Sequence, residues 1–144
     1  MPTLLEFSQP NLLAYPKETV IAEKFEAMVK LGIANSRMKD FWDIKLMVNE
    51  FEFNGAVLQE ALIATFERRH TKFPTEIPLA LTDEFADDKT KQSQWSSFLR
   101  TSGIDDSSSL TGTTALLLAF FYPLIEAAGE KTKFTRLWVS HRWA

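Results

Sequence analysis

The sequence predicts a mainly α-helical protein, a bundle of about six helices with a short extended or β-type arm at its N-terminus. Two observations favour this fold class. Apolar residues recur at helical spacing along most of the chain, as at Val20, Ile21, Phe25 and Met28. Glycine, proline and polar stretches separate these segments. With 144 residues, 45% of them hydrophobic, the chain is expected to be a single domain, residues 1–144, that buries its own core.

Residues 1–14 form the expected arm. The segment from Thr3 to Phe7 lies between Pro2 and Pro10, which suits a short strand followed by an extended loop. Backbone groups of a single strand need a partner strand. We therefore expect this arm to pair with another chain or with a further segment.

Residues 15–50 carry a predicted pair of helices. The first begins after Pro16 and ends near Gly32, which is a suitable C-terminal cap. Ser36 is a suitable N-cap for the second helix. The apolar stripe of the second helix is expected to consist of Met38, Phe41, Trp42, Leu46 and Val48.

Residues 51–128 are expected to complete the bundle. A turn at Asn54-Gly55 precedes a third helix from Ala56 to Arg69. The apolar positions of that helix include Val57, Ala61, Ala64 and Phe66. Two shorter helices are expected from Leu79 to Ala86 and from Asp88 to Arg100.

The last third of the chain contains a linker, an apolar helix and an aromatic tail. The linker spans 101–109, and the helix runs from Leu110 to Ala128 with a kink expected near Phe120, because Pro123 lies inside it. In the tail, residues 129–144, Trp138 and Trp143 are expected to pack back on the bundle or to fill a groove of a partner. Stacking on nucleic-acid bases is a further alternative for these two indoles.

Composition excludes several classes of protein. The net charge of -3 and the sequence pI of about 5.4 give no overall attraction for nucleic acid or an anionic membrane. The absence of cysteine excludes disulfides and thiolate sites and suits a cytoplasmic location. The N-terminus does not resemble a signal peptide. The longest apolar run, Ala115 to Ile125, is shorter than the roughly 20 residues that span a membrane, so we expect a buried helix and no membrane partner.

Charged residues in the helix pair give the best candidate site. Lys24 lies four residues from both Val20 and Met28, so it projects along the apolar stripe of its helix. Asp40 and Asp43 share one face of the next helix. A buried ammonium needs a partner, and two carboxylates could supply it.

Two interpretations of this cluster remain open. In the first, Lys24 faces a phosphate beside an aspartate that binds Mg²⁺ or accepts a proton, as phosphoryl and nucleotidyl transfer require. In the second, Lys24 reaches water and the aspartates are early-helix charges favoured by the helix dipole. Arg37 and Lys39 are placed to pair with Asp40 and Asp43 in either case.

Other candidates have simpler explanations. His70 and His141 show no ligand spacing, so no metal site is expected. The basic cluster of residues 68–72 could contact a nucleic-acid backbone, although cations at a helix C-terminus are stabilised there without any ligand.

The helix pair resembles a known family. Glu23-Lys24 followed by residues 35–43 (NSRMKDFWD) is similar to the C-terminal motifs of the AbiEii/AbiGii toxins, nucleotidyltransferase-like proteins of bacterial toxin–antitoxin and abortive-infection systems that are related to the MenT toxins. Residues 65–69, 78–85 and 94–98 also resemble one subgroup. The resemblance covers residues 3–100 and depends on both halves of the motif together.

The resemblance implies roles for individual residues. Lys24 would contact the nucleotide triphosphate, and Asp40 with Asp43 would serve the catalytic site. Arg37 and Lys39 would support that site or bind the phosphates. The implied activity is transfer of a nucleotide from an NTP, in related toxins to tRNA, with Mg²⁺ as cofactor. The implied partner is an antitoxin.

One departure from the family is large. The sequence has no Gly-Ser dipeptide and no Asp-x-Asp pair, which in the family hold the catalytic metals. We therefore expect the truncated, C-terminal helical part of such a toxin, inactive alone, with Mg²⁺ and NTP bound only by a complete enzyme. The alternative is a non-catalytic interaction module, which binds an antitoxin or forms a homodimer through its arms.

Overall fold

The computed structural model describes residues 16–32, 37–104 and 109–144, and these residues form a mainly helical protein as predicted. The expected strand Thr3 to Phe7 and the expected N-cap Ser36 lie outside the described residues. The helices of the described part are α1 (Lys17–Leu31), α2 (Met38–Glu50), α3 (Gly55–Arg68), the 3₁₀ helix η3 (Leu79–Leu81), α4 (Asp83–Asp87), α5 (Lys89–Thr101) and α6 (Leu110–Glu130). The strands are β2 (Phe53–Asn54), β3 (Leu137–Val139) and β4 (Arg142–Trp143).

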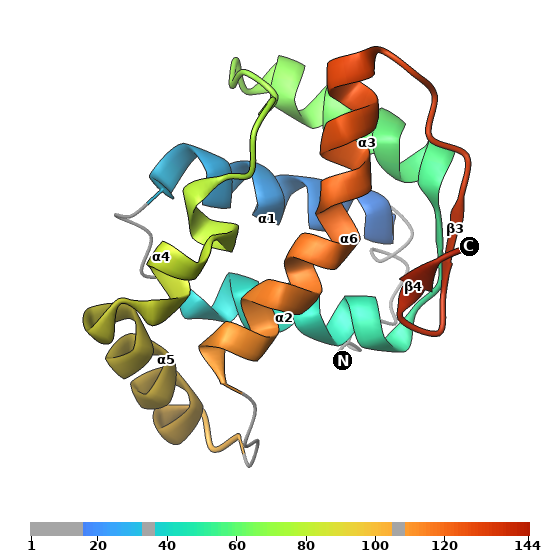
Figure 1. The fold of residues 1–144 in the computed structure, drawn as a ribbon. Coiled ribbons are helices and arrows are strands. Elements are labelled where there is room, and N and C mark those ends of the chain that lie inside the picture. Colours follow the sequence, from blue (N-terminus) through green and yellow to red (C-terminus); the bar gives the residue numbers. More distant parts are fainter. Residues whose placement is uncertain (1–15, 33–36, 105–108) are drawn as a thin grey trace.

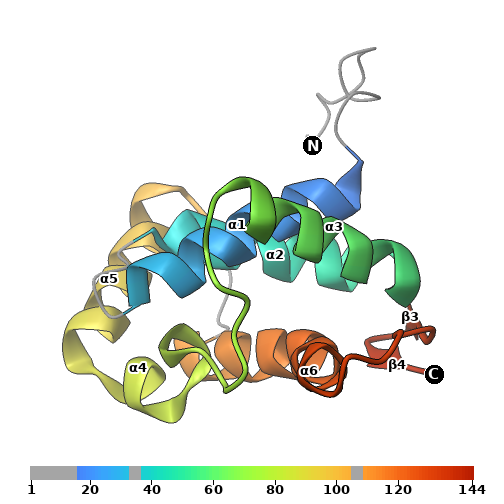
Figure 2. The same ribbon diagram turned by 90° about the horizontal axis from the view of Figure 1, so that it is seen from above.

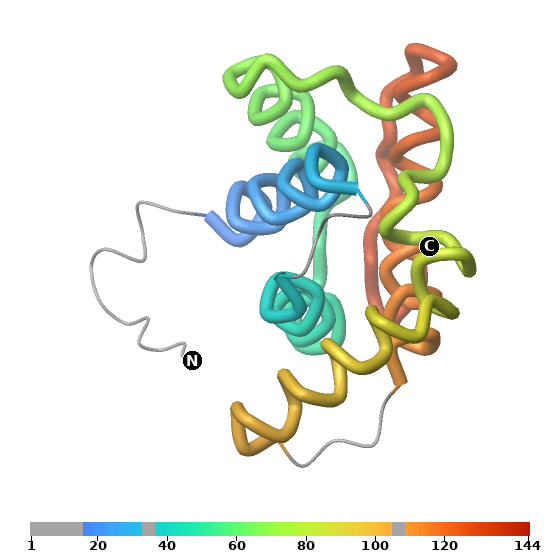
Figure 3. The backbone as a smooth tube through the Cα atoms, turned by 90° about the vertical axis from the view of Figure 1, so that its left-hand side faces the viewer, coloured from blue at the N-terminus to red at the C-terminus, as the bar shows by residue number. Residues whose placement is uncertain are grey.

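The helices form two layers. Helices α1, α2 and α3 lie together, and the long helix α6 crosses them on one side, as Figures 1 and 2 show. The side view in Figure 3 shows α1 and α2 on the same side of α6, with α5 extending beyond the end of α2. This arrangement places the N-terminal half of α2 between α1 and α5.

Aromatic side chains fill the space between the two layers. The rings of Phe25 on α1 and Phe121 on α6 stack with centroids 3.9 Å apart and planes at 11°. Phe41 on α2 stacks on Phe85 on α4, with centroids 5.4 Å apart. Aromatic pairs of this kind contribute beyond the apolar area that they bury. They fix α1 and α2 relative to the rest of the core.

Helix α6 is the apolar centre of the fold. It is long and apolar enough to cross a membrane, with a mean hydropathy of 1.4 over an 18-residue window, but half of that window is buried inside the protein. Leu117, Phe120 and Leu124 are among its buried residues, as expected for a core helix. The helix continues through Pro123 to Glu130, two residues further than predicted.

The C-terminal tail forms strands that the sequence analysis did not predict. Strand β3 pairs antiparallel with both β2 and β4. Trp138 is 1% exposed, and its indole Nε1 donates a hydrogen bond to the Val48 carbonyl at 2.9 Å. Trp143 Nε1 donates to the Phe120 carbonyl at 2.9 Å. The carbonyl one residue earlier has no helical donor, because Pro123 has no N–H group. The tail therefore packs back on the bundle, and its indoles are engaged within the protein.

Three local predictions were wrong. Asn54-Gly55 is the start of α3 and not a turn: the Asn54 side chain accepts hydrogen bonds from the backbone of Ala56 and Val57. The helix expected from Leu79 to Ala86 is divided into η3 and α4, because Thr82 caps α4 by accepting from the Phe85 amide. Three residues assigned to apolar stripes are exposed, namely Leu46, Val57 and Ala64.

Candidate functional site

Helix α1 directs Lys24 toward α2. Its buried residues Ile21, Phe25 and Met28 face the core, and Lys24 projects from the border of that stripe. The Lys24 Nζ atom lies 3.0 Å from Asp40 Oδ1 and 3.0 Å from Asp43 Oδ2. The predicted contact between one ammonium and two carboxylates of the next helix is therefore present.

Helix α2 presents both carboxylates on one face because they are three residues apart. The side chain of Asp40 is only 6% exposed. The side chain of Asp43 lies nearer the surface, at 22% exposure. The Lys24 side chain, which contacts both carboxylates, is 23% exposed.

Two further cations border this contact on the outside. Arg37 Nε lies 3.0 Å from Asp40 Oδ2, and Lys39 Nζ lies 2.7 Å from Asp43 Oδ2. Both basic side chains are mostly exposed. The structure thus brings together all five residues that the sequence singled out, which we call the Lys24 cluster: Lys24, Arg37, Lys39, Asp40 and Asp43.

The Lys24 cluster keeps its lysine charged. Burial by itself would lower the pKa of Lys24, but the nearby charge of Asp43 and the hydrogen bonds to Asp40 and Asp43 outweigh burial and raise that pKa above its ordinary value. The three cations of the cluster outnumber its two carboxylates and leave one net positive charge. An anion is therefore the ligand that this surface favours.

The cluster does not fit a resident Mg²⁺ ion. Mg²⁺ binds oxygen ligands in octahedral geometry, usually carboxylates together with phosphates and water. Here the oxygens of Asp40 and Asp43 already accept contacts from three cations. Within residues 16–32, 37–104 and 109–144, no group of three or more His, Cys, Asp or Glu side chains is close enough to hold a metal.

A second charged network fixes α1 against α3. The buried carboxylate of Glu26 accepts from Arg69 Nη1 at 2.8 Å and from Thr71 Oγ1 at 2.5 Å. Glu23 accepts from Arg68 Nη2 at 3.3 Å on the surface. Two arginines of the basic cluster 68–72 are therefore paired with α1, and spacing within residues 68–72 alone did not predict these pairs.

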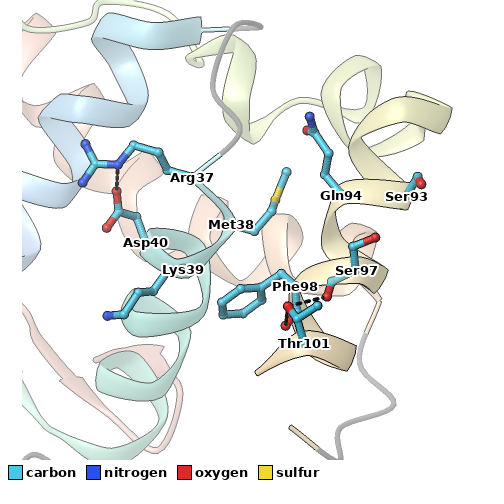
Figure 4. A pocket seen from close by; sticks show the side chains of 9 residues that line it. All are labelled: Arg37, Met38, Lys39, Asp40, Ser93, Gln94, Ser97, Phe98 and Thr101. Atoms are coloured by element: carbon cyan, nitrogen blue, oxygen red, sulfur yellow. Dashed lines mark hydrogen bonds and ion pairs between the residues drawn. The ribbon is translucent and has the colours of Figure 1, made fainter. Parts of the chain in front are cut away.

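An open cavity of about 580 Å³ adjoins the Lys24 cluster. It lies between the N-terminal end of α2 and one face of α5, as Figure 4 shows. Arg37, Lys39 and Asp40 form one wall. The face of α5 that forms the other wall was not predicted to belong to a site, although residues 94–98 contribute to the family resemblance. It consists of Ser93, Gln94, Ser97, Phe98 and Thr101.

A comparison with protein families identifies the family of this helical chain. Residues 1–126 match the family model described as "Nucleotidyl transferase AbiEii toxin, Type IV TA system". The chain belongs to this family, and it is a nucleotidyltransferase-like protein of the toxin–antitoxin class. Comparison with curated proteins and with solved structures gave no match.

Proposed function

We propose that this chain supplies the phosphate-binding part of a nucleotidyl transferase site in a toxin of a toxin–antitoxin system. The observation that carries the proposal is the contact of Lys24 with both Asp40 and Asp43 at the surface of the helix pair. An ammonium group has three N–H donors, and these two contacts use two of them. The third is available to a phosphate oxygen.

Electrostatics supports a triphosphate as the ligand. The Lys24 cluster has a net positive charge, and Arg37 and Lys39 extend it toward solvent. The cluster also lies at the N-terminal end of α2, where the helix dipole favours an anion. In the proposed site Arg37 and Lys39 bind the outer phosphates, while Asp40 and Asp43 orient Lys24 and keep it protonated.

The proposed reaction transfers a nucleotide from an NTP to RNA, with tRNA as the acceptor by family resemblance, in the cytoplasm. Mg²⁺ would accompany the triphosphate. The sequence contains no Asp-x-Asp pair, and the carboxylates of the Lys24 cluster are already paired with cations. We therefore propose that residues 1–144 alone do not complete the reaction, and that carboxylates from elsewhere must hold the metals.

Two measurements test this proposal. The purified chain, mixed with Mg²⁺, radiolabelled NTPs and tRNA, is expected to produce no labelled tRNA, and efficient labelling would overturn the proposed incompleteness. Tripolyphosphate is expected to bind the chain, and the double variant Arg37→Gln/Lys39→Gln should weaken that binding at least tenfold. Lys133→Gln is the matched control, because Lys133 is exposed and lies in the tail. Equal binding by wild type and the double variant would contradict the phosphate role.

One observation favours a second function, a non-catalytic interaction module. Lys24 already pairs with both Asp40 and Asp43 without any ligand, as in a purely structural ion pair. In this function the chain binds an antitoxin or forms a homodimer through residues 1–14. Light scattering on the chain with and without residues 1–14 tests the homodimer: the full chain should have the mass of a dimer and the shortened chain that of a monomer. Identical oligomeric states would rule out pairing through the arm.

A further inference from the structure

The cavity beside the Lys24 cluster has the size and lining of a small-molecule site. Its volume of about 580 Å³ lies within the usual range for ligand pockets. Two cations of the Lys24 cluster, Arg37 and Lys39, line the wall on α2, and Figure 4 shows their charged ends directed away from α5, which forms the opposite wall. A ligand with an anionic end and an uncharged end could therefore occupy the cluster and the cavity together.

The uncharged part of the cavity combines apolar and polar groups. Met38 and Phe98 supply apolar surface, and Figure 4 shows the ring of Phe98 turned toward α2. The flat face of a nucleobase stacks favourably on an aromatic ring. Ser97 and Thr101 supply hydroxyl groups on the same face of α5. The Ser97 hydroxyl accepts from Arg100 Nη2 at 3.2 Å, and its own proton can still be donated to a ribose oxygen.

The side chain of Gln94 gives evidence for a ligand that is independent of the charges in the Lys24 cluster. Its Oε1 atom is buried and accepts no hydrogen bond, and it is the one such side-chain atom found in the described part of the chain. A buried acceptor without a donor is unfavourable by about 1–3 kcal/mol. In Figure 4 the side chains of Gln94 and Met38 lie side by side, extending from facing helices. The Gln94 side chain lines the cavity, and a rotation of its amide would present Oε1 to a ligand with an N–H donor there.

We propose that this cavity binds the nucleoside part of the nucleotide, with Gln94 accepting a hydrogen bond from an N–H group at the edge of the base. The base packs against Phe98 and Met38, and its phosphates extend to Arg37 and Lys39. This inference rests on the proposed function, because it takes the Lys24 cluster as the phosphate site. It adds a recognition surface on α5 for the base.

The test compares ligands that differ in one part at a time. Calorimetry on the full chain would measure binding of tripolyphosphate, of the four natural NTPs and of purine riboside triphosphate, whose base has no N–H donor. The NTP that binds most tightly is expected to exceed purine riboside triphosphate by about fivefold, the usual contribution of one hydrogen bond. Natural NTPs that bind no more tightly than purine riboside triphosphate would overturn the inference.

Variants of α5 make the test specific. Gln94→Leu should reduce binding of the preferred NTP to that of purine riboside triphosphate and leave tripolyphosphate binding unchanged. Gln94→Glu keeps an acceptor and should retain the preference, although its charge weakens binding of all triphosphates. Ser96→Ala is the matched control, because Ser96 is exposed on the same helix and does not line the cavity.

The outcomes separate this inference from the proposed function. If tripolyphosphate binds through Arg37 and Lys39 but the NTP preference survives in Gln94→Leu, the nucleoside site is wrong and the phosphate site stands. If tripolyphosphate does not bind the wild-type chain, both are wrong. Circular dichroism of each variant shows whether a loss of binding follows from a loss of fold, and the Gln94→Glu variant then decides the assignment.

Discussion

The carboxylate of Glu26 on α1 accepts a hydrogen bond at 2.8 Å from the guanidinium of Arg69, which directly follows α3. Glu26 is only 2% exposed. Burial would raise the pKa of Glu26, but hydrogen bonds from Thr71 and Arg69 and the charges of Arg69 and Lys30 lower it below its ordinary value. This pair fixes the helix that carries Lys24. Its strength should therefore depend on pH.

Acid should remove the stabilisation that Glu26 provides. Because its pKa is lower in the folded protein, its contribution is complete above the unfolded value of about 4.3 and is lost as the pH falls through the folded value. Glu26→Gln should decrease the free energy of unfolding by about 1–3 kcal/mol at pH 7. In urea titrations at several pH values, the difference between wild type and variant should shrink below about pH 4.3.

Glu23→Gln is the matched control for this prediction. Glu23 pairs with Arg68 on the surface, where an ion pair contributes about 0–1 kcal/mol. Its substitution should change stability little at any pH. A Glu26→Gln effect that is equally large at pH 3 and pH 7 would show that packing, and not charge, explains it.

Gly55→Ala should destabilise the protein, although alanine is the better helix former. A Cβ atom at position 55 would lie 2.5 Å from the Arg136 carbonyl oxygen and 2.5 Å from the Phe134 ring. We expect a loss of about 1–3 kcal/mol, because the segment that leads into strand β3 would have to move. Gly129→Ala on α6 is the control: open space surrounds it, and it should gain about 0.5 kcal/mol. Equal effects in thermal unfolding would contradict this account.

The loop between β3 and β4 has a sequence that does not suit its backbone conformation, so a substitution there should raise stability. Ser140 and His141 both have positive φ, 52° and 66°, as the two central residues of a hairpin turn that strongly favours Asn-Gly. Replacing them with Asn-Gly should raise the free energy of unfolding by about 1 kcal/mol, or the melting temperature by roughly 3 °C. His141→Ala alone should bring no gain. A lower melting temperature for the Asn-Gly variant would refute the predicted turn strain.

Lys24→Met tests how the two helices are joined. The variant leaves the buried Asp40 and its neighbour Asp43 without their shared ammonium. The free energy of unfolding should therefore decrease by about 2–3 kcal/mol, which is less than for a fully buried ion pair because Lys24 is partly exposed. Adding Asp40→Asn should restore part of the loss. Additive losses in this double-mutant cycle would mean that the two side chains do not interact.

Some of these features could be predicted from the sequence because they depend on helical spacing alone. Lys24 lies along the apolar stripe of its helix, and Asp40 and Asp43 share one face of the next helix. The contact between the lysine and the two carboxylates therefore follows once the two helices are adjacent. The same reasoning assigned some wrong residues to the apolar stripe of α2. It included Leu46, which is exposed, and omitted Ile44, which is fully buried.

Other features depend on tertiary contacts that spacing does not encode. The sequence Asn54-Gly55 is typical of both a turn and a helix start. In the structure it starts a helix, and the Gly55 amide donates a hydrogen bond to the Arg136 carbonyl at 2.8 Å. The tail strands were missed because Ser140-His141 is not a usual hairpin sequence. The α5 wall of the cavity is visible only when α2 packs beside it.

The two indole hydrogen bonds of the tail have a mechanical consequence. Trp138 holds α2 at Val48, and Trp143 holds α6 at Phe120, so the C-terminal half of α2 is braced against the long helix. Met38, at the other end of α2, is ten residues away, or about 15 Å along the axis. A slight rotation of α2 about its braced end would displace Arg37 and Lys39 more than any residue near Val48. Shortening the tail should therefore weaken the proposed binding of an anion at Arg37 and Lys39, although the tail contacts the opposite end of α2.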